Sequence, residues 1–292
     1  MTDFDTVVVG QVSRDINTDY QGHTVYELGG AVVYSSYAAA ALGHRVCAVP
    51  KADPTIDAVE LFAANPAITV HPVASPTSTS IENVYHTADK ERRTCRCLSR
   101  IASYAPADLP DVTSPLWHLA GLMFGDVPDT LIPVVAERGA VAVDVQGLLR
   151  HAHPDGSMTF LDWENKRDYL PLIKFLKTDS AEAEILTGLT DRAKAAEQLV
   201  AWGAAEVMIT HSSEVLAFDG DTMATQPLKP RNLSGRSGRG DTCFSGYITE
   251  RLSHPLDEAL LMAAALVSLK MEKVGPFEGT RQDVAAYIAD FY

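Results

Sequence analysis

Short apolar runs alternate with helix-like segments along most of the chain. Residues 6–10 are typical of a buried strand that ends at a glycine, and residues 31–43 have the small side chains of a helix packed closely on a sheet. Further apolar runs follow, mostly separated by segments with a helical pattern, such as 129–139 and 191–203. Strands that alternate with helices favour a doubly wound α/β fold, in which a mostly parallel sheet is flanked by helices on both faces.

Two stretches depart from that alternation. Residues 15–28 and 77–97 alternate apolar and polar side chains with the period of a strand and contain turn residues. They predict antiparallel strands that form a small β-sheet lid, with a charged turn at 89–93 from which Arg92 or Arg93 would reach into the cleft when the lid closes. Because no repeat or obvious linker is present, residues 1–292 are expected to form a single domain with the lid inserted into it.

Composition limits the partners of the chain. It has 292 residues, of which 46% are hydrophobic, enough to fill one large core. The formal net charge of -14 argues against nucleic-acid and membrane partners, since both need an excess of Lys and Arg on one face. An anionic ligand must therefore be held by a local group of residues. The acidic start, the lack of a long apolar segment and the absence of Cys-x-x-Cys pairs predict a cytoplasmic protein with reduced thiols.

The glycine-rich stretch at residues 234–247 is the strongest candidate for chemistry. It places three glycines and two arginines before Asp241 and then continues as an apolar, helix-like run. Such a loop lets backbone N–H groups turn inward and, with the helix N-terminus, form an anion hole. A carboxylate beside the anion can accept the proton of an attacking hydroxyl. The alternative, that Asp241 simply caps the helix, fits the local pattern equally well.

This stretch resembles the C-terminal signature of the PfkB, or ribokinase-like, family of small-molecule kinases. The family pattern runs Gly-Ala-Gly-Asp, then an aromatic residue and a glycine, and residues 238–246 match it with Arg239 in place of alanine. The resemblance implies a ribokinase-like fold, an anion hole formed by Gly238, Arg239 and Gly240, and Asp241 as the catalytic base.

The N-terminal region carries two more motifs of the same family, in the same order. Gly29 and Gly30 open a helix that ends Leu-Gly, and Asp15 stands where the family binds substrate hydroxyls. Tyr34 takes the position of an asparagine that commonly helps to hold the substrate. The resemblance therefore does not name the substrate.

Two segments correspond to the nucleotide and metal side of the family. Asp179 and Glu182 resemble its Asn-x-x-Glu segment, which implies that they order the water shell of Mg²⁺. The family's Thr-x-Gly-x-x-Gly pattern keeps Thr210, but Ser212 and Val215 replace both glycines. Ser212 still offers a hydroxyl and a backbone N–H to a phosphate.

Residues 141–150 resemble the branch of the family that contains myo-inositol kinases and related sugar kinases, and so does the arginine inside the glycine loop. In this stretch Arg150 is a candidate for pairing with a phosphate or orienting the substrate. A buried structural salt bridge made by Asp144 or Arg150 explains the pattern equally well.

The resemblance implies ATP-dependent phosphorylation of a hydroxyl on a small sugar or cyclitol, with Mg²⁺ and, as a further candidate, a monovalent cation as cofactors. Lid closure would exclude water, and the protein is expected to be a monomer or a homodimer formed through the lid. The implied site consists of substrate residues Asp15, Gly29, Gly30, Tyr34 and Arg150, nucleotide residues Asp179, Thr210, Ser212, Gly238 and Gly240, metal residues Asp179 and Glu182, and catalytic residues Gly238, Arg239, Gly240 and Asp241.

Other functions are compatible with parts of the same sequence. A nucleoside kinase of the same fold is one alternative, and a non-catalytic sugar- or nucleotide-sensing relative is another, because the glycines near Ser212 are missing. An NAD-dependent dehydrogenase is disfavoured because the first strand lacks the Gly-x-Gly-x-x-Gly that lets pyrophosphate approach a helix. A P-loop kinase is excluded because its Gly-x-x-x-x-Gly-Lys-Ser/Thr motif does not occur.

Overall fold

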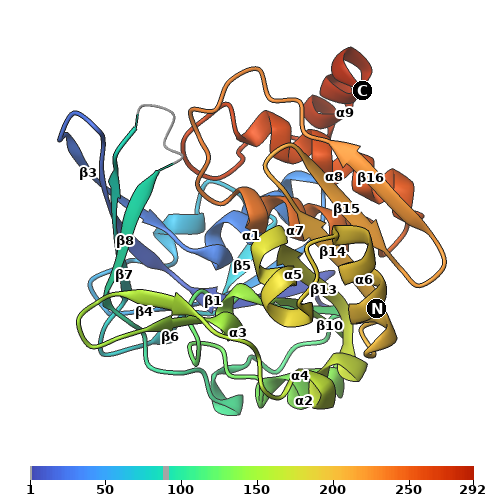
Figure 1. Ribbon diagram of the computed structural model, residues 1–292. Coiled ribbons are helices and arrows are strands. Elements are labelled where there is room, and N and C mark those ends of the chain that lie inside the picture. Colours follow the sequence, from blue (N-terminus) through green and yellow to red (C-terminus); the bar gives the residue numbers. More distant parts are fainter. Residues whose placement is uncertain (1, 88–91) are drawn as a thin grey trace.

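A ten-stranded sheet forms the centre of the computed structural model, which describes residues 2–87 and 92–292 (Figure 1). Its strand order is β16-β15-β14-β13-β10-β9-β1-β4-β5, with β6 beside β4. The pairs from β14 to β5 are parallel, whereas β15 and β16 add an antiparallel edge. The strands are β1 (Thr6–Gln11), β4 (Val46–Ala52), β5 (Ile68–Val70), β6 (Val73–Ala74), β9 (Leu116–Leu119), β10 (Ala140–Asp144), β13 (Ile173–Asp179), β14 (Glu206–Thr210), β15 (Glu214–Phe218) and β16 (Met223–Pro227).

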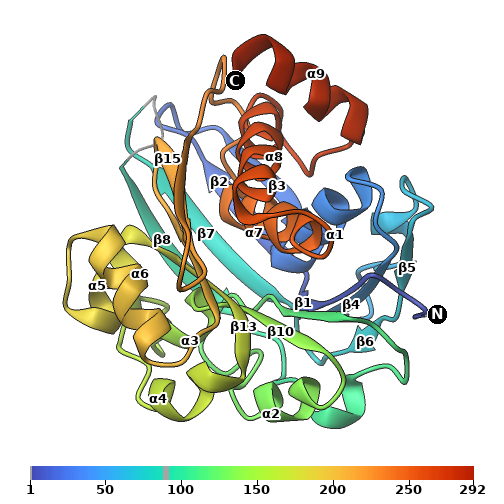
Figure 2. The ribbon, with the colours of Figure 1, turned by 90° about the vertical axis from the view of Figure 1, so that its right-hand side faces the viewer.

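Helices cover both faces of this sheet because its strands are apolar on both sides. In β1, Val7 and Val9 pack in one core with α2, α5 and α6, and Val8 packs in another core with α1. Figure 2 shows α1, α7, α8 and α9 together on one side of the sheet. The helices are α1 (Ala31–Ala41), α2 (Leu131–Ala136), α3 (Gln146–Leu149), α4 (Lys166–Tyr169), α5 (Ser180–Thr187), α6 (Arg192–Ala201), α7 (Arg239–Glu250), α8 (Leu256–Lys270) and α9 (Arg281–Phe291), with short 3-10 turns at Glu60–Phe62, Pro106–Asp108 and Leu170–Leu172.

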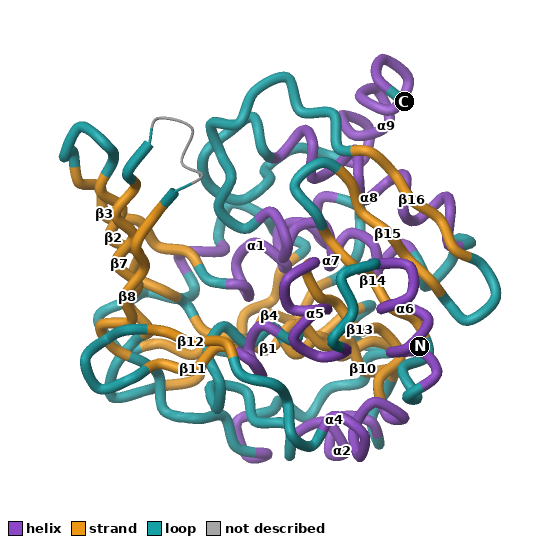
Figure 3. The backbone as a smooth tube through the Cα atoms, in the orientation of Figure 1, coloured by secondary structure: helices purple, strands orange, loops and turns teal. Residues whose placement is uncertain are grey.

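The lid is a separate four-stranded sheet with the order β3-β2-β7-β8 (Figure 3). Its strands are β2 (Ser13–Thr18), β3 (Thr24–Gly29), β7 (Thr79–Tyr85) and β8 (Arg93–Ser99), so strands occur in both predicted lid regions. The prediction that all of them are antiparallel was wrong, because β2 and β7 pair in parallel. The physical reason is that β2 follows β1 and β7 follows β6, two parallel strands of the main sheet, so both hairpins leave the same edge. Residues 88–91 lie outside the described residues, and with them the first three residues, 89–91, of the predicted charged turn.

The remaining elements are small. Strands β11 (Arg150–Ala152) and β12 (Met158–Phe160) form an antiparallel pair. Within the described part of the chain, no helix is both long enough and apolar enough to cross a membrane.

Candidate active site

A cleft of about 410 Å³ lies between the lid and the edge of the main sheet at which the parallel strands end. Open α/β sheets bind ligands at this edge. Gly29, Glu182 and Ser212 are not among the residues that line the cleft. The predicted site residues that do line it are Asp15, Gly30, Tyr34, Arg150, Asp179, Thr210, Gly238, Arg239, Gly240 and Asp241.

Two glycines allow close backbone contacts on the floor of the cleft. Gly30 caps α1 with a φ of 104°, and a Cβ there would lie 2.2 Å from the carbonyl oxygen of Gln11. Gly238 caps α7 with a φ of 71°, and its Cβ would lie 2.1 Å from Cγ of Tyr34. L-residues rarely adopt such dihedrals, so both positions require glycine. The Tyr34 ring therefore packs directly against the start of the glycine loop.

The glycine loop leads into the N-terminus of α7, where the first backbone N–H groups of a helix have no partner within it. Gly238, Arg239 and Gly240 all line the cleft at this end. The helix dipole adds positive potential at the same place. The geometry therefore fits the predicted anion hole.

Asp241 is not the cap of α7. The cap position belongs to Gly238, and Asp241 is the third residue of the helix, on the wall of the cleft. Burial raises the pKa of Asp241 to about 6, and the charge of Asp144 adds to this effect, while Lys177 opposes it. A carboxylate with this pKa is ionised at pH 7 but more basic than an ordinary aspartate, which suits a general base.

Lys177 is a cleft residue that the sequence reasoning missed. It lies in β13, buried, with Nζ 2.9 Å from Oδ2 of Asp144 and 3.9 Å from Oε2 of Glu182. Burial alone would lower the pKa of Lys177, but the two carboxylates raise it well above its usual value. The ammonium thus stays charged and can bind a phosphate. A lysine within an apolar strand, two residues before the predicted Asp179, was the signal available in the sequence.

Asp179 and Glu182 form a reciprocal cap at the start of α5. Oδ1 of Asp179 accepts the N–H of Glu182 at 2.8 Å, and Oε2 of Glu182 accepts the N–H of Asp179 at 2.7 Å. The second oxygen of Glu182, Oε1, is buried and has no hydrogen-bond partner among the described residues. Burial raises the pKa of Glu182 to about 7.

This arrangement fits Mg²⁺ held through water. Within residues 2–87 and 92–292, no three His, Cys, Asp or Glu side chains gather as a metal-binding cluster. Mg²⁺ usually keeps several waters and needs only one or two carboxylates. Asp179 lines the cleft and is the first candidate, and the buried, unpartnered oxygen of Glu182, its partner in the reciprocal cap, is the second.

The lid end of the cleft carries a connected set of polar side chains. Asn17 donates to Oε2 of Glu27 at 2.7 Å, and Asn83 donates to Oδ1 of Asn17 at 3.0 Å. Asp15 lies beside them, its Oδ1 buried and without a hydrogen-bond partner among the described residues, and burial raises its pKa. The sequence reasoning missed the other three residues of this set. For Asn17 a signal was available, since it lies two residues after Asp15 and so on the same face of the strand.

Two arginines also line the cleft, one from the lid strand β8 and one from the start of β11. They are Arg93 and Arg150, and burial lowers the pKa of Arg150. Nε of Arg150 is buried and has no partner among the residues that the structure describes. The alternative explanation for residues 141–150 was a buried salt bridge made by Asp144 or Arg150. Asp144 does form a buried salt bridge, and its partner is Lys177.

Comparisons with known proteins bear on the family and the fold of the chain. The sequence profile of the pfkB family carbohydrate kinases matches residues 4–282. A sulfate-bound pyrophosphate-dependent kinase of the ribokinase family superposes with a TM-score of 0.88 at 30% identity, over 96% of this chain and 99% of that chain. A pyrophosphate-dependent kinase of that family in complex with a pyrophosphate analogue and myo-inositol gives 0.86 at 30% identity, with the same coverage.

A more distant similarity shows the fold alone. Ribokinase from Arabidopsis thaliana, complexed with ribose and ATP, superposes with a TM-score of 0.76 at 16% identity over 99% of both chains. No curated protein is matched by sequence. The predicted ribokinase-like fold is confirmed by these structural similarities.

Proposed function

Because the chain belongs to the pfkB family of carbohydrate kinases, we propose that it phosphorylates a hydroxyl of a small sugar or cyclitol with Asp241 as the general base. The observation that carries this proposal is the position of Asp241. It lies at the N-terminus of α7, in one cleft with the polar residues of the lid and with Lys177. The acceptor, the base and the phosphate charge can therefore meet at one point.

The transfer step follows from this arrangement. The acceptor hydroxyl gives its proton to the Asp241 carboxylate while its oxygen forms a bond to the terminal phosphorus of the donor. The bond from that phosphorus to the leaving oxygen breaks, and the electron pair stays on the leaving group. The N–H groups at the start of α7 and the Lys177 ammonium stabilise the charge that develops. Asp179 and Glu182 would hold Mg²⁺, which would supply positive charge against the donor phosphates.

The lid end of the cleft favours a polyhydroxylated ring as acceptor. Asp15 and Asn17 of β2, with Glu27 and Asn83 on the two flanking strands, present carboxylate and amide groups to the cleft, and these can donate and accept several hydrogen bonds at once. A kinase at 30% identity is complexed with myo-inositol, which supports a cyclitol over a nucleoside. A nucleoside kinase stays the alternative.

ATP is the donor that the sequence predicts, and a second candidate is inorganic pyrophosphate. Lys177, Arg236 and Arg239 line the donor end, whereas the loop at Ser212, where the family's glycines are replaced, lies outside the cleft. Positive charge without a recognisable nucleotide segment suits a small phosphate donor such as pyrophosphate. Two kinases at 30% identity are pyrophosphate-dependent.

The test is an assay of purified protein with a panel of sugars, cyclitols and nucleosides and with either ATP or pyrophosphate as donor. Phosphate-ester formation is followed by ³¹P NMR, which does not depend on the identity of the donor. Asp241→Asn is expected to lower kcat by about 10²-fold to 10⁴-fold with an unchanged melting temperature. Asp257→Asn, an exposed acidic residue in the first turn of α8, is the matched control and should leave kcat unchanged.

The outcomes separate the candidates. Normal turnover by Asp241→Asn would show that another group is the base. Acceptor binding without product, with either donor and across the whole panel, would favour the sensing relative over the kinase. Product formed from nucleosides alone would assign the acceptor to that class instead of cyclitols.

A further inference from the structure

A buried lysine lies directly behind the glycine loop. Lys270 is the last residue of α8, and its side chain is 1% exposed. Its Nζ donates to the carbonyl oxygen of Gly235 at 2.7 Å and also to that of Ser237, and it lies 4.9 Å from the centroid of the Tyr34 ring. An ammonium has three N–H donors. Two backbone carbonyls and one aromatic face therefore account for all of them.

The ammonium is held by these neutral groups and not by an ion pair. No carboxylate of the described residues lies within ion-pair distance of Lys270 Nζ, although Asp241 and Glu27 act on it from farther away. Burial lowers the pKa of Lys270 to about 8, so the group still carries its charge at pH 7. Burying a cation without a counterion is costly, and an apolar side chain would fill the same space without that cost. This cost points to a role for the charge itself.

The role follows from the geometry of the peptide unit. In a trans peptide the C=O and the next N–H point in opposite directions. When Lys270 holds the Ser237 carbonyl on the helix side of the loop, the N–H of Gly238 is directed to the other side. Gly238 lines the cleft, and the Tyr34 ring packs against it. Lys270 thus orients one of the N–H groups assigned to the anion hole.

We propose that Lys270 is a built-in cation that holds the glycine loop in its anion-binding conformation, so that the protein needs no alkali cation there. Alkali cations in proteins are bound by converging backbone carbonyls, and the carbonyls of Gly235 and Ser237 already converge on the ammonium. The monovalent cation implied by the family resemblance therefore does not fit at this loop. Lys270 is a positioning residue, since it touches the loop and not the substrate. The kinetic part of this inference rests on the proposed function.

The test compares wild-type protein with Lys270→Ala, which leaves room for a cation, and Lys270→Met, which fills that space without charge. Turnover and the affinity for pyrophosphate, measured by calorimetry, are determined in salts of tetramethylammonium, Na⁺, K⁺ and NH₄⁺. Wild-type values should agree within about twofold in all four salts. Both variants should lose about 10-fold to 100-fold in kcat, and K⁺ or NH₄⁺ should restore at least fivefold in Lys270→Ala but not in Lys270→Met.

Lys273→Met is the control, because this exposed lysine lies just beyond the end of α8 and its replacement should change neither value. The inference is overturned if K⁺ activates the wild-type protein more than about threefold, a measurement that needs no variant. It is also overturned if a folded Lys270→Ala regains nothing from any cation. If the wild type shows no turnover with any donor, the proposed function fails. The role of Lys270 would still be supported if the wild type binds pyrophosphate equally in all salts and Lys270→Ala recovers that binding only with K⁺ or NH₄⁺.

Discussion

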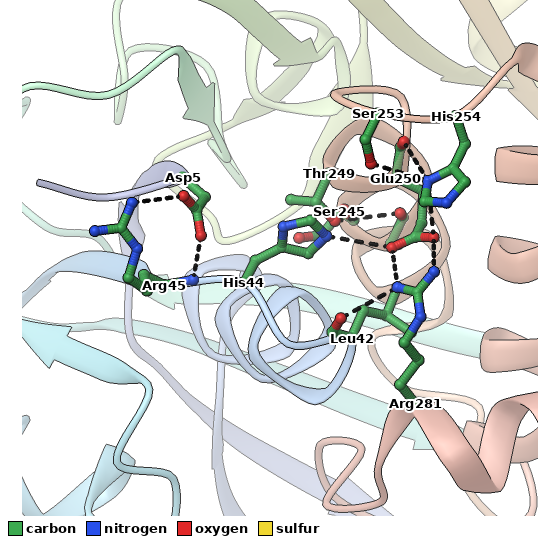
Figure 4. A network of polar contacts seen from close by, with 11 residues as sticks. Asp5, Leu42, His44, Arg45, Ser245, Thr249, Glu250, Ser253, His254 and Arg281 are labelled. Atoms are coloured by element: carbon green, nitrogen blue, oxygen red, sulfur yellow. Dashed lines mark hydrogen bonds and ion pairs between the residues drawn. The ribbon is translucent and has the colours of Figure 1, made fainter. Parts of the chain in front are cut away.

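Glu250 is the last residue of α7, at the end of the helix opposite the glycine loop, and its replacement measures how strongly this helix is held in place. Figure 4 shows its carboxylate between Arg281 of α9 and His44. Nη2 of Arg281 donates to Oε2 at 2.7 Å, and Nε2 of His44 lies 3.2 Å from Oε1. The Glu250 side chain is 2% exposed. The network thus joins α7 to α9 and to the turn after α1.

The size of the effect follows from the pKa of Glu250. Burial would raise this pKa, but the hydrogen bonds from His44 and Arg281 outweigh burial and lower it from 4.5 to about 2. Such a shift corresponds to at most about 3 kcal/mol of stability at neutral pH. The Arg281 side chain is 41% exposed, so water screens part of the attraction, and about 2 kcal/mol is expected. For a chain of this length that amounts to a fall of about 3 °C in Tm.

The assay is thermal and urea unfolding of Glu250→Gln beside the wild type, with Glu258→Gln, an exposed residue of α8, as control. Because the folded pKa of Glu250 is depressed, its contribution is complete above about pH 4.5 and is lost as the pH falls toward 2. The gap between wild type and Glu250→Gln should therefore close over that window. A Tm within 1 °C of the wild type at pH 7, or a gap that stays constant down to pH 3, would refute the reasoning.

Four further predictions concern the cleft. Wild-type kcat/KM should fall about tenfold per pH unit below pH 6, because Asp241 must be ionised to accept a proton; a flat profile down to pH 5 would contradict its role. Gly238→Ala should lower kcat by at least about 10²-fold, since its Cβ would overlap the Tyr34 ring; normal kcat in steady-state assays would show that the loop tolerates the shift. Lys177→Met should raise the donor KM at least about tenfold, with the acceptor KM unchanged. Asn83→Leu should raise the acceptor KM, by about 1 kcal/mol in binding free energy per lost hydrogen bond, and leave the donor KM unchanged. If either substitution changed both KM values equally, Lys177 and Asn83 would not bind the donor and the acceptor separately.

Local pattern was sufficient where a segment's own side chains decide its structure. The apolar run of β1 and the small residues of α1 were predicted correctly, because burial on one or both faces leaves a period in the sequence. The glycine loop was recognisable for a similar reason. Gly238 has a left-handed φ, which favours glycine, so the high glycine content of the loop was visible in the sequence. Short strands such as β5, β6, β11 and β12 were missed, because two or three residues carry no period.

The amino-acid sequence by itself was enough to predict the α/β class, the family, the strands in both predicted lid regions and the glycine loop before α7. The tertiary structure decided which distant groups share the cleft and how each is charged. Lys177 meets Asp144 across 33 positions and Lys270 meets Gly235 across 35, and neither pairing leaves a local signal. The pKa of Asp241 likewise depends on burial by segments far away in the chain. Periodicity and backbone dihedrals are local properties, whereas desolvation and charge coupling exist only after the chain has packed.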